Sequence, residues 1–186
     1  MDKRTDEQLV DAYLKGEEPA LEILIGRYLS PLYNFAFKYV RSQMAAEDVA
    51  QEALVKIWRN LKKYKPAYKF KTWAFTITKN TALDYLKRKG LVALAETDGF
   101  EDGALMRALV SAAPLPEEII ERAENAQTIK TAVAKLSGKY RQVLALYYEY
   151  GLNFREIAET LKESIDTIKT RHRRAVIYLK KDLRDK

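Results

Sequence analysis

Apolar side chains recur every three or four residues along most of the chain, which is the spacing of one face of an α-helix. The clearest stripe is Val49, Ala53, Ile57 and Leu61, each four residues after the last. No stretch alternates apolar and polar residues between turn signals, as a half-buried strand does. The pattern therefore predicts an all-α fold and argues against a sheet.

Short polar motifs predict where several helices begin. Thr5-Asp6-Glu7-Gln8 and Asn153-Phe154-Arg155-Glu156 both have the form of a capping box. Pro19 suits the first turn of a second helix, and Pro31 is expected to kink that helix or restart it before it continues to residue 40. The remaining pattern predicts helices over residues 47–61, 72–89 and 139–148, and one from Ser164 to about Leu179.

Basic residues gather in two blocks. Residues 1–89 carry 17 basic and 11 acidic side chains, and residues 117–186 carry 15 and 11. Between them, residues 90–116 carry 1 basic and 4 acidic side chains, with glycines and prolines and no sustained helical stripe. We therefore expect two small helical domains, 1–89 and 117–186, joined by a flexible linker. The net charge of +7 favours a polyanionic partner.

Composition excludes several classes of function. The chain has no cysteine and one histidine, which excludes disulfides, cysteine-ligated metal and thiol nucleophiles. We expect no metal site and no cofactor. The longest apolar runs are much shorter than the roughly 18 residues that a membrane span needs, and the first residues carry no apolar signal core.

The C-terminal block has the layout of a helix-turn-helix. The helix that begins at Asn153 is expected to stop just after Leu161, and Ser164 can cap the next one. On that last helix, Ile168, Ala175 and Leu179 share one face and are expected in the core.

The opposite face of the last helix carries a polar stripe, made of Asp166, Lys169, Thr170 and Arg173 and flanked by Thr167 and Arg174. Cationic and hydroxyl side chains on such a helix suit the DNA major groove. The alternative is a solvated basic face on an ordinary helical bundle.

A second polar stripe lies on the predicted helix over 47–61, at Asp48, Gln51, Glu52 and Val55. This net-acidic face can dock on a basic partner surface. The alternative is a solvated face with a Glu52–Lys56 pair. No nucleophile, metal set or phosphate loop accompanies these carboxylates, so we expect no catalysis.

Lysines alternate with aromatic residues between Tyr64 and Trp73. Aromatic rings can stack on unpaired bases while lysines hold the backbone, as in single-strand binding. On the helix that follows, one sector is shared by Trp73, Thr76, Lys79, Asn80, Leu83 and Lys87. The alternative is that Phe70 and Trp73 are core residues.

Together these motifs resemble bacterial RNA polymerase sigma factors of the extracytoplasmic-function (ECF) class, in the sigma-70-type family. Residues 46–58 and Phe70-Lys71-Thr72-Trp73 resemble sigma region 2. Residues 140–144, 151–158 and 167–171 resemble sigma region 4. The second set alone would also fit two-component-type regulators, which carry a similar helix-turn-helix.

The resemblance implies three sets of site residues. Binding to the polymerase core would use Asp48, Gln51, Glu52, Val55 and Trp58. Recognition and melting of the −10 region would use Tyr64, Lys69, Phe70, Lys71, Trp73, Thr76, Lys79, Asn80 and Lys87. Recognition of the −35 region would use Arg155, Ser164, Asp166, Thr167, Lys169, Thr170, Arg171, Arg173 and Arg174.

The resemblance also implies partners and a location. These are core RNA polymerase through its β′ and β subunits, promoter DNA as duplex and melted strand, and an anti-sigma factor. The chain would be a non-catalytic specificity subunit in the bacterial cytoplasm, associated with the nucleoid through the polymerase. A stand-alone helix-turn-helix regulator and a helical adaptor that uses only the acidic face are the alternatives.

The sequence departs from the family pattern at three places. Lys162-Glu163 stands where the turn usually has glycine and an apolar residue, and lysine costs more than glycine in a left-handed turn. Asp166 replaces a usual glycine and could accept from a cytosine amino group or repel phosphate. His172 replaces a usual leucine, and we interpret it as a packed boundary residue, because no second histidine or cysteine could share a metal with it.

Overall fold

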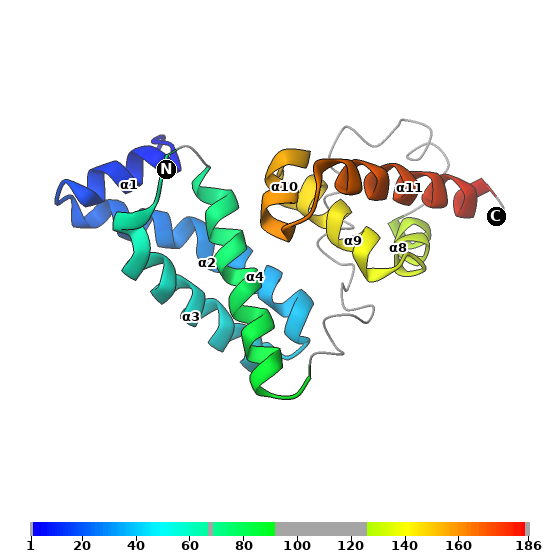
Figure 1. The fold of residues 1–186 in the computed structure, drawn as a ribbon, viewed down its shortest axis with the longest axis horizontal. Helices are drawn as coiled ribbons and strands as arrows, with labels where there is room; N and C mark the ends of the chain where they lie inside the picture. The colour runs from blue at the N-terminus through cyan, green and yellow to red at the C-terminus, as the bar shows by residue number, and fades with distance from the viewer. Residues whose placement is uncertain (1, 67–68, 92–125, 185–186) are drawn as a thin grey trace. The chain divides into compact units, whose positions relative to one another are not determined.

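The computed structural model describes residues 2–66, 69–91 and 126–184, and the chain divides into two compact units, Met1–Glu96 and Thr97–Lys186. The predicted linker, 90–116, lies outside the described residues except for its first two positions. Within the described residues every regular element is a helix and none is a strand (Figure 1). The all-α prediction is confirmed.

The N-terminal unit is built around one long helix. Its α-helices are α1 (Asp6–Leu14), α2 (Glu18–Val40), α3 (Gln43–Asn60) and α4 (Phe70–Arg88), with a 3₁₀ turn over Leu61–Lys63. Helix α2 packs against α1, α3 and α4, and α3 also packs against α4 (Figure 1). The fully buried core includes Leu9, Leu24, Leu32, Phe35 and Phe75.

Helix α1 begins as its motif predicts. The Gln8 N–H donates to the Thr5 hydroxyl at 3.2 Å, and the Thr5 N–H donates to the Gln8 side-chain oxygen at 2.8 Å. This reciprocal arrangement satisfies two backbone donors at the helix start.

Helix α2 runs unbroken for 23 residues through Pro31, so the expected restart is absent. Proline removes one intrahelical hydrogen bond and crowds the preceding turn, at a cost of about 3 kcal/mol. The buried stripe of Leu24, Tyr28, Leu32 and Phe35 continues across the proline, and its packing outweighs that local cost. Pro19 lies in the first turn, as predicted.

Helix α3 starts four residues before the predicted Glu47. The backbone of Arg41 is left-handed, with φ 53°, and ends α2. Ser42 then caps α3 by accepting from the Ala45 N–H at 3.4 Å. The Val49, Ala53, Ile57 and Leu61 stripe is buried, at 0–5% exposure.

The C-terminal unit packs around its last helix. Its elements are α8 (Ala126–Ala134), α9 (Gly138–Leu144), a π-helical turn (Ala145–Glu149), α10 (Phe154–Leu161) and α11 (Ile165–Arg184). Helix α11 packs against α8, α9 and α10 (Figure 1). It continues five residues past the predicted end at Leu179, because Leu183 extends the buried stripe and Asp182 pairs with Lys135.

No helix in the described parts of the chain is long and apolar enough to cross a membrane.

Candidate nucleic-acid and protein interfaces

The second capping box fixes the start of α10. The side chain of Asn153 accepts from the Arg155 and Glu156 N–H groups, each at 3.0 Å. Glu156 accepts from the Asn153 N–H at 2.7 Å. Leu152 and Ile157 on either side of the cap are buried. This end of the helix is therefore placed by local sequence, as predicted.

The turn between α10 and α11 is tight. Lys162 has φ 58° and ψ 45°, the left-handed conformation that glycine adopts most easily. The Glu163 N–H donates back to the Ala158 carbonyl at 3.0 Å, which closes α10. Ser164 caps α11 by accepting from the Thr167 N–H at 3.1 Å. The helix-turn-helix therefore forms with lysine at the strained position.

Glu163, which stands where the turn usually has an apolar residue, forms an ion pair with Arg171. The guanidinium of Arg171 donates to one Glu163 carboxylate oxygen at 2.8 Å and lies 2.7 Å from the other. Both side chains are less than one third exposed. Arg171 was expected to contact DNA, but in this structure its guanidinium holds the turn.

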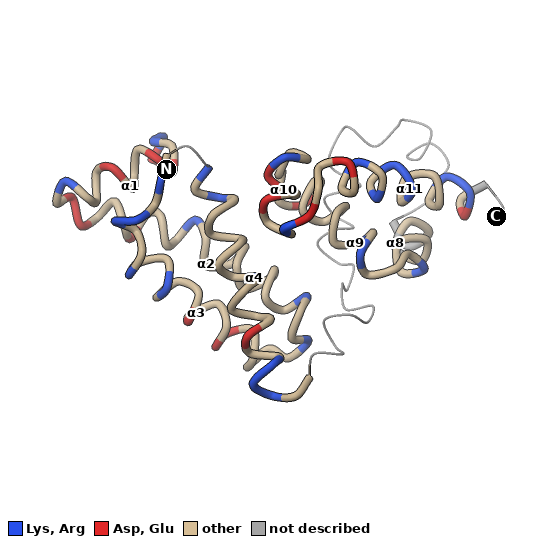
Figure 2. The backbone as a smooth tube through the Cα atoms, in the orientation of Figure 1, with Lys and Arg blue, Asp and Glu red and all other residues tan. Residues whose placement is uncertain are grey.

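The two faces of α11 separate as the periodicity predicts. Ile168, Ala175 and Leu179 are buried, at 0–1% exposure. Basic residues are spaced along the helix (Figure 2). Of the predicted DNA-binding residues, Arg155, Ser164, Asp166, Lys169, Arg173 and Arg174 are exposed, and Thr167, Thr170 and Arg171 are half-buried.

A groove extends this face onto α9. It is lined by Ser137, Lys139 and Tyr140 together with Asp166, Thr167, Thr170, Arg171 and Arg174. The residues from α9 were not among the predicted site residues. The spacing of apolar residues over 139–148 predicts a helix there. It does not indicate that the start of this helix packs beside the basic stripe of α11.

His172 is packed among aromatic rings. Its ring centroid lies 4.9 Å from that of Tyr147, 5.6 Å from Tyr148 and 5.1 Å from Phe154. Its Nε2 is 3.2 Å from the Tyr148 hydroxyl. Burial lowers the pKa of His172, which favours the neutral ring. This agrees with the interpretation of His172 as a packed boundary residue.

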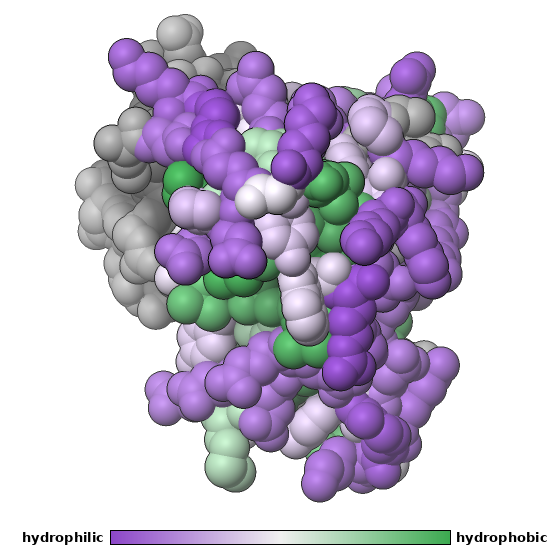
Figure 3. All heavy atoms as spheres, turned by 90° about the vertical axis from the view of Figure 1, so that its left-hand side faces the viewer, coloured by the Kyte–Doolittle hydropathy of each residue, from purple (hydrophilic) through white to green (hydrophobic). Residues whose placement is uncertain are grey.

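The predicted protein-docking face of α3 is largely exposed. Asp48 and Gln51 are exposed, and Val55 and Trp58 are 43% and 50% exposed. The Trp58 Nε1–H donates to the Tyr13 hydroxyl at 2.9 Å, which ties this face to α1. Figure 3 shows hydrophobic patches among hydrophilic side chains on one face of the protein.

Glu52 differs from the other residues of the docking face, because it is already paired. Its carboxylate oxygens lie 2.8 Å from Lys56 and 2.9 Å from Arg88 of α4. The hydrogen bond from Lys56 lowers the pKa of Glu52, and the hydrogen bond from Arg88 adds a smaller effect in the same direction. The Glu52–Lys56 pair that was weighed as the alternative is therefore present.

Helix α2 contributes to the same surface. An apolar groove beside the face is lined by Leu29, Ser30 and Tyr33 of α2 and by Glu47, Ala50 and Gln51 of α3. Leu29 is 50% exposed. Leu29 and Tyr33 could not be assigned to this surface from the sequence, because the pattern of one helix does not show which neighbouring helix its faces border.

Two aromatics predicted to contact DNA, Tyr64 and Phe70, are buried, and for Phe70 this is the core position weighed as the alternative. Phe70 is 1% exposed and Tyr64 is 9% exposed. The Phe70 ring centroid lies 5.1 Å from Tyr28 and 5.7 Å from Tyr64, both edge-on. Because both rings are buried, neither presents a face for base stacking in this conformation. Burial of such large rings is strongly favourable. Burial also raises the pKa of Tyr64 to about 12.

The other residues of this predicted set reach the surface to different degrees. Trp73 is half-buried and its ring centroid lies 5.3 Å from that of Tyr64. Lys69 and Lys87 are exposed. The other members of the set are half-buried: Lys71, Thr76, Lys79 and Asn80. Residues 67–68 of the preceding loop lie outside the described residues.

Comparison with known families assigns both units. Residues 24–91 match the profile of Sigma-70 region 2, and residues 126–179 match that of Sigma-70, region 4. The chain is thus built from two domains of the sigma-70 family.

Relatives that match along most of the chain narrow the assignment to one class of sigma factor. The chain is 32% identical over 173 residues to the ECF RNA polymerase sigma factor SigW of Bacillus subtilis, with 92% of each chain covered. It is 29% identical to the ECF RNA polymerase sigma-E factor of Escherichia coli, covering 92% of this chain and 90% of that one. The chain therefore belongs to the ECF sigma factors. It directs promoter-specific initiation of transcription. These matches favour a sigma factor over a stand-alone helix-turn-helix regulator.

Solved structures share the fold. CnrH in complex with the cytosolic domain of CnrY matches with a TM-score of 0.60 and 22% identity, covering 94% of each chain. The sigma factor RpoE in complex with the anti-sigma factor NepR, from Bartonella quintana, matches with a TM-score of 0.58 and 24% identity. That match covers 88% of this chain and 96% of the RpoE chain.

Proposed function

We propose that this sigma factor docks on core RNA polymerase through α3 and reads promoter DNA through α4 and α11. The observation that carries the proposal is the exposure of two unlike helix faces in one chain. One is a mixed acidic and apolar face on α3, and the other is a basic face on the second helix of a helix-turn-helix.

The α3 face is suited to a protein partner. Trp58 and Val55 expose apolar surface beside the acidic and amide groups of Asp48 and Gln51. A partly exposed tryptophan surrounded by polar groups is typical of the residues that dominate protein interfaces. Glu52 would act at the rim, because Lys56 and Arg88 already neutralise it.

The α11 face is suited to the −35 element in the major groove. Lys169 and Arg173 lie one helical turn apart and are exposed, so both can donate to guanine edges or phosphate. Thr167 and Thr170 supply hydroxyls beside them. Asp166 at the start of the helix would accept from a cytosine amino group. Arg171 would act mainly by keeping the turn in place for these contacts.

The α4 face is suited to the −10 element. Lys79 and Asn80 lie on the part of the helix that is half exposed, and Lys87 is exposed near its end. Trp73 keeps part of its ring accessible for stacking. Tyr64 and Phe70 would serve as the packed base beneath this surface.

The domains would span 1–89 and 117–186, with 90–116 as the linker that lets both promoter elements be read at once on polymerase. The chain would be a non-catalytic subunit that acts with the polymerase in the cytoplasm. An anti-sigma factor would control it, a role supported by the RpoE–NepR complex, whose sigma factor shares this fold.

Site-specific photocrosslinking tests the face assignments. A crosslinker at Lys169 in the assembled holoenzyme should capture the −35 region, and one at Lys79 should capture the −10 region. A crosslinker at Asp182, which α11 keeps near Lys135 at its far end, is the matched control and should capture neither. Capture of the same promoter segment from Lys169 and Lys79 would contradict the proposal.

A further inference from the structure

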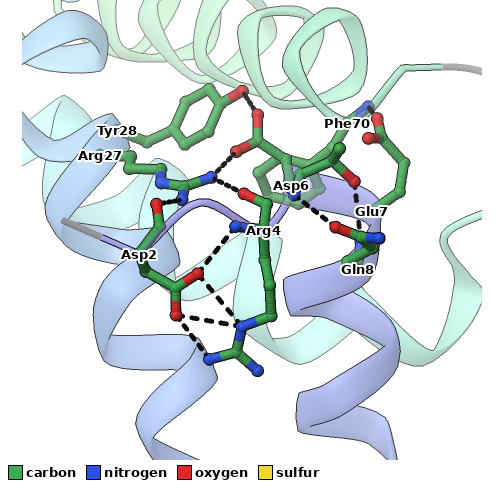
Figure 4. A network of polar contacts seen from close by, with 9 residues as sticks. Asp2, Arg4, Asp6, Glu7, Gln8, Arg27, Tyr28 and Phe70 are labelled. Atoms are coloured by element: carbon green, nitrogen blue, oxygen red, sulfur yellow. Dashed lines mark hydrogen bonds and ion pairs between the residues drawn. The ribbon is translucent and has the colours of Figure 1, made fainter.

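The first residues of the chain form a polar network that reaches the start of α4 (Figure 4). The Arg27 guanidinium on α2 donates to the carbonyl oxygens of Asp2 and Arg4, each at 2.8 Å. It also pairs with Asp6 at 2.9 Å, and the Tyr28 hydroxyl donates to the same carboxylate. The N-terminal segment is therefore fastened to α2 just before α1 begins.

Glu7, the residue after Asp6, connects this network to α4. The Glu7 carboxylate accepts from the backbone N–H of Phe70, the first residue of α4, at 3.1 Å (Figure 4). Lys69, at the N-cap position of α4, makes no side-chain capping bond. A carboxylate at a helix start satisfies a free N–H and interacts favourably with the helix dipole. Glu7 thus supplies from α1 the cap that the sequence of α4 lacks.

The capped residue is also the centre of the aromatic cluster. The Phe70 ring lies edge-on to Tyr28 and Tyr64 and 5.7 Å from Trp73. Tyr28 is bonded to Asp6, which precedes Glu7. Two adjacent acidic residues of α1 therefore hold both the backbone and the ring packing at the point where the lysine-rich loop enters α4.

We propose that Glu7 is a positioning residue for promoter opening, which sets the start of α4 and with it the surface that captures the melted −10 strand. The inference rests on the proposed role of α4 in binding that strand. Glu7 acts through the Phe70 backbone and does not touch DNA. With its carboxylate in place, the first N–H of α4 is not available to a DNA phosphate, so Lys69 and Lys71 side chains provide the phosphate contacts.

The test follows promoter opening by holoenzyme on a duplex carrying 2-aminopurine in the −10 non-template strand. We expect Glu7→Ala to reduce the extent of opening about fivefold, the equivalent of losing a cap worth about 1 kcal/mol. Glu7→Gln keeps an accepting oxygen and should stay within about twofold of the unmodified chain. Affinity for core polymerase should not change in either variant.

A rescue variant separates positioning from general stability. Lys69→Ser places a capping hydroxyl at the N-cap of α4, where it can accept from the N–H of Lys71 or Thr72, so Glu7→Ala should reduce opening less in the Lys69→Ser background than in the unmodified chain. Lys69→Ser alone reports the cost of the lost lysine charge. Glu22→Ala, which removes an exposed carboxylate from α2, is the matched control and should open promoters normally.

The possible failures are distinguishable. Normal opening by Glu7→Ala, alongside defective opening by Asn80→Ala, would overturn the role of Glu7 and leave the proposed function standing. Normal opening by both variants would overturn the proposed role of α4 as well. Loss of core binding by Glu7→Ala, or a full fivefold effect of Glu7→Ala in the Lys69→Ser background, would assign Glu7 a general stabilising role and refute the inference.

Discussion

Arg171 on α11 forms a two-pronged ion pair with Glu163 in the turn that precedes this helix, at 2.8 and 2.7 Å. Paired hydrogen bonds of this geometry combine charge with a fixed orientation. They hold the turn at Lys162, whose left-handed backbone costs about 1 kcal/mol for a residue with a Cβ. The pair therefore offsets a local strain that glycine would avoid.

A double-mutant cycle of Glu163→Gln and Arg171→Gln should give a coupling free energy of about 1 kcal/mol. The pair is less than one third exposed, so solvent screens it only in part. Native-state hydrogen exchange of the α10 and α11 amides in the full chain measures the coupling. Glu159→Gln, an exposed change on α10, should leave exchange unaltered. Additive effects of the two substitutions would show that the ion pair does not support the turn.

Replacing Lys169 and Arg173 together by alanine should reduce −35-dependent transcription by at least tenfold, because each lost base or phosphate contact costs about 1–3 kcal/mol. Binding to core polymerase should stay intact. The salt dependence of promoter binding should also become shallower. Lys181→Ala removes an exposed charge further along the same helix and serves as the control. Unchanged promoter use by the double variant would mean that another face of α11 meets DNA.

Asp48→Arg should weaken the affinity of the chain for core polymerase by tenfold or more, because it reverses an exposed charge on the proposed docking face. Gln51→Ala should have a smaller effect in the same direction. Titration of labelled chain with core polymerase measures both. Glu22→Arg reverses an exposed charge on α2 and should bind normally. Equal loss of affinity with Glu22→Arg would point to bulk charge and against a specific face.

The sequence predicted the helices well where one local motif decides them. The capping boxes at Thr5 and Asn153 and the buried faces of α3 and α11 follow from hydrogen-bonding capacity and period alone. The restart expected at Pro31 as an alternative to a kink is absent, because the local cost of proline is visible in the sequence while the packing on both sides is not. The start of α3 was missed because Ser42 lacks the acidic or amide partner that completes a capping box.

The candidate sites were less predictable. An aromatic between lysines reads the same whether it faces DNA or the core, so Phe70 and Tyr64 could be assigned only from their burial. The bond from Glu7 to the Phe70 backbone joins residues 63 positions apart. The Glu163–Arg171 pair depends on how the turn folds back along α11. No pattern in a single sequence specifies either contact.

Stability of the C-terminal unit should fall as the pH drops through the ordinary histidine value of 6.5. Burial lowers the pKa of His172, so the unfolded chain binds the proton more readily than the folded one. The contribution of neutral, buried His172 to stability is complete above pH 6.5 and is lost progressively as the pH falls below 6.5. His172→Phe should remove the dependence between pH 7 and about 5.5, where no other side-chain type ordinarily titrates. Hydrogen exchange in α10 and α11 measures the effect, and an unchanged pH profile in His172→Phe would exclude His172 as its source.

Run-off transcription with purified bacterial core polymerase and genomic template is the decisive test of whether this chain is a promoter-specificity subunit. We expect discrete start sites that require this chain and share −35 and −10 elements. These starts should disappear with Asp48→Arg, which weakens core binding, and with the Lys169→Ala, Arg173→Ala double variant, which weakens −35 binding. The absence of any chain-dependent start site would contradict the assignment of this protein as a polymerase specificity subunit.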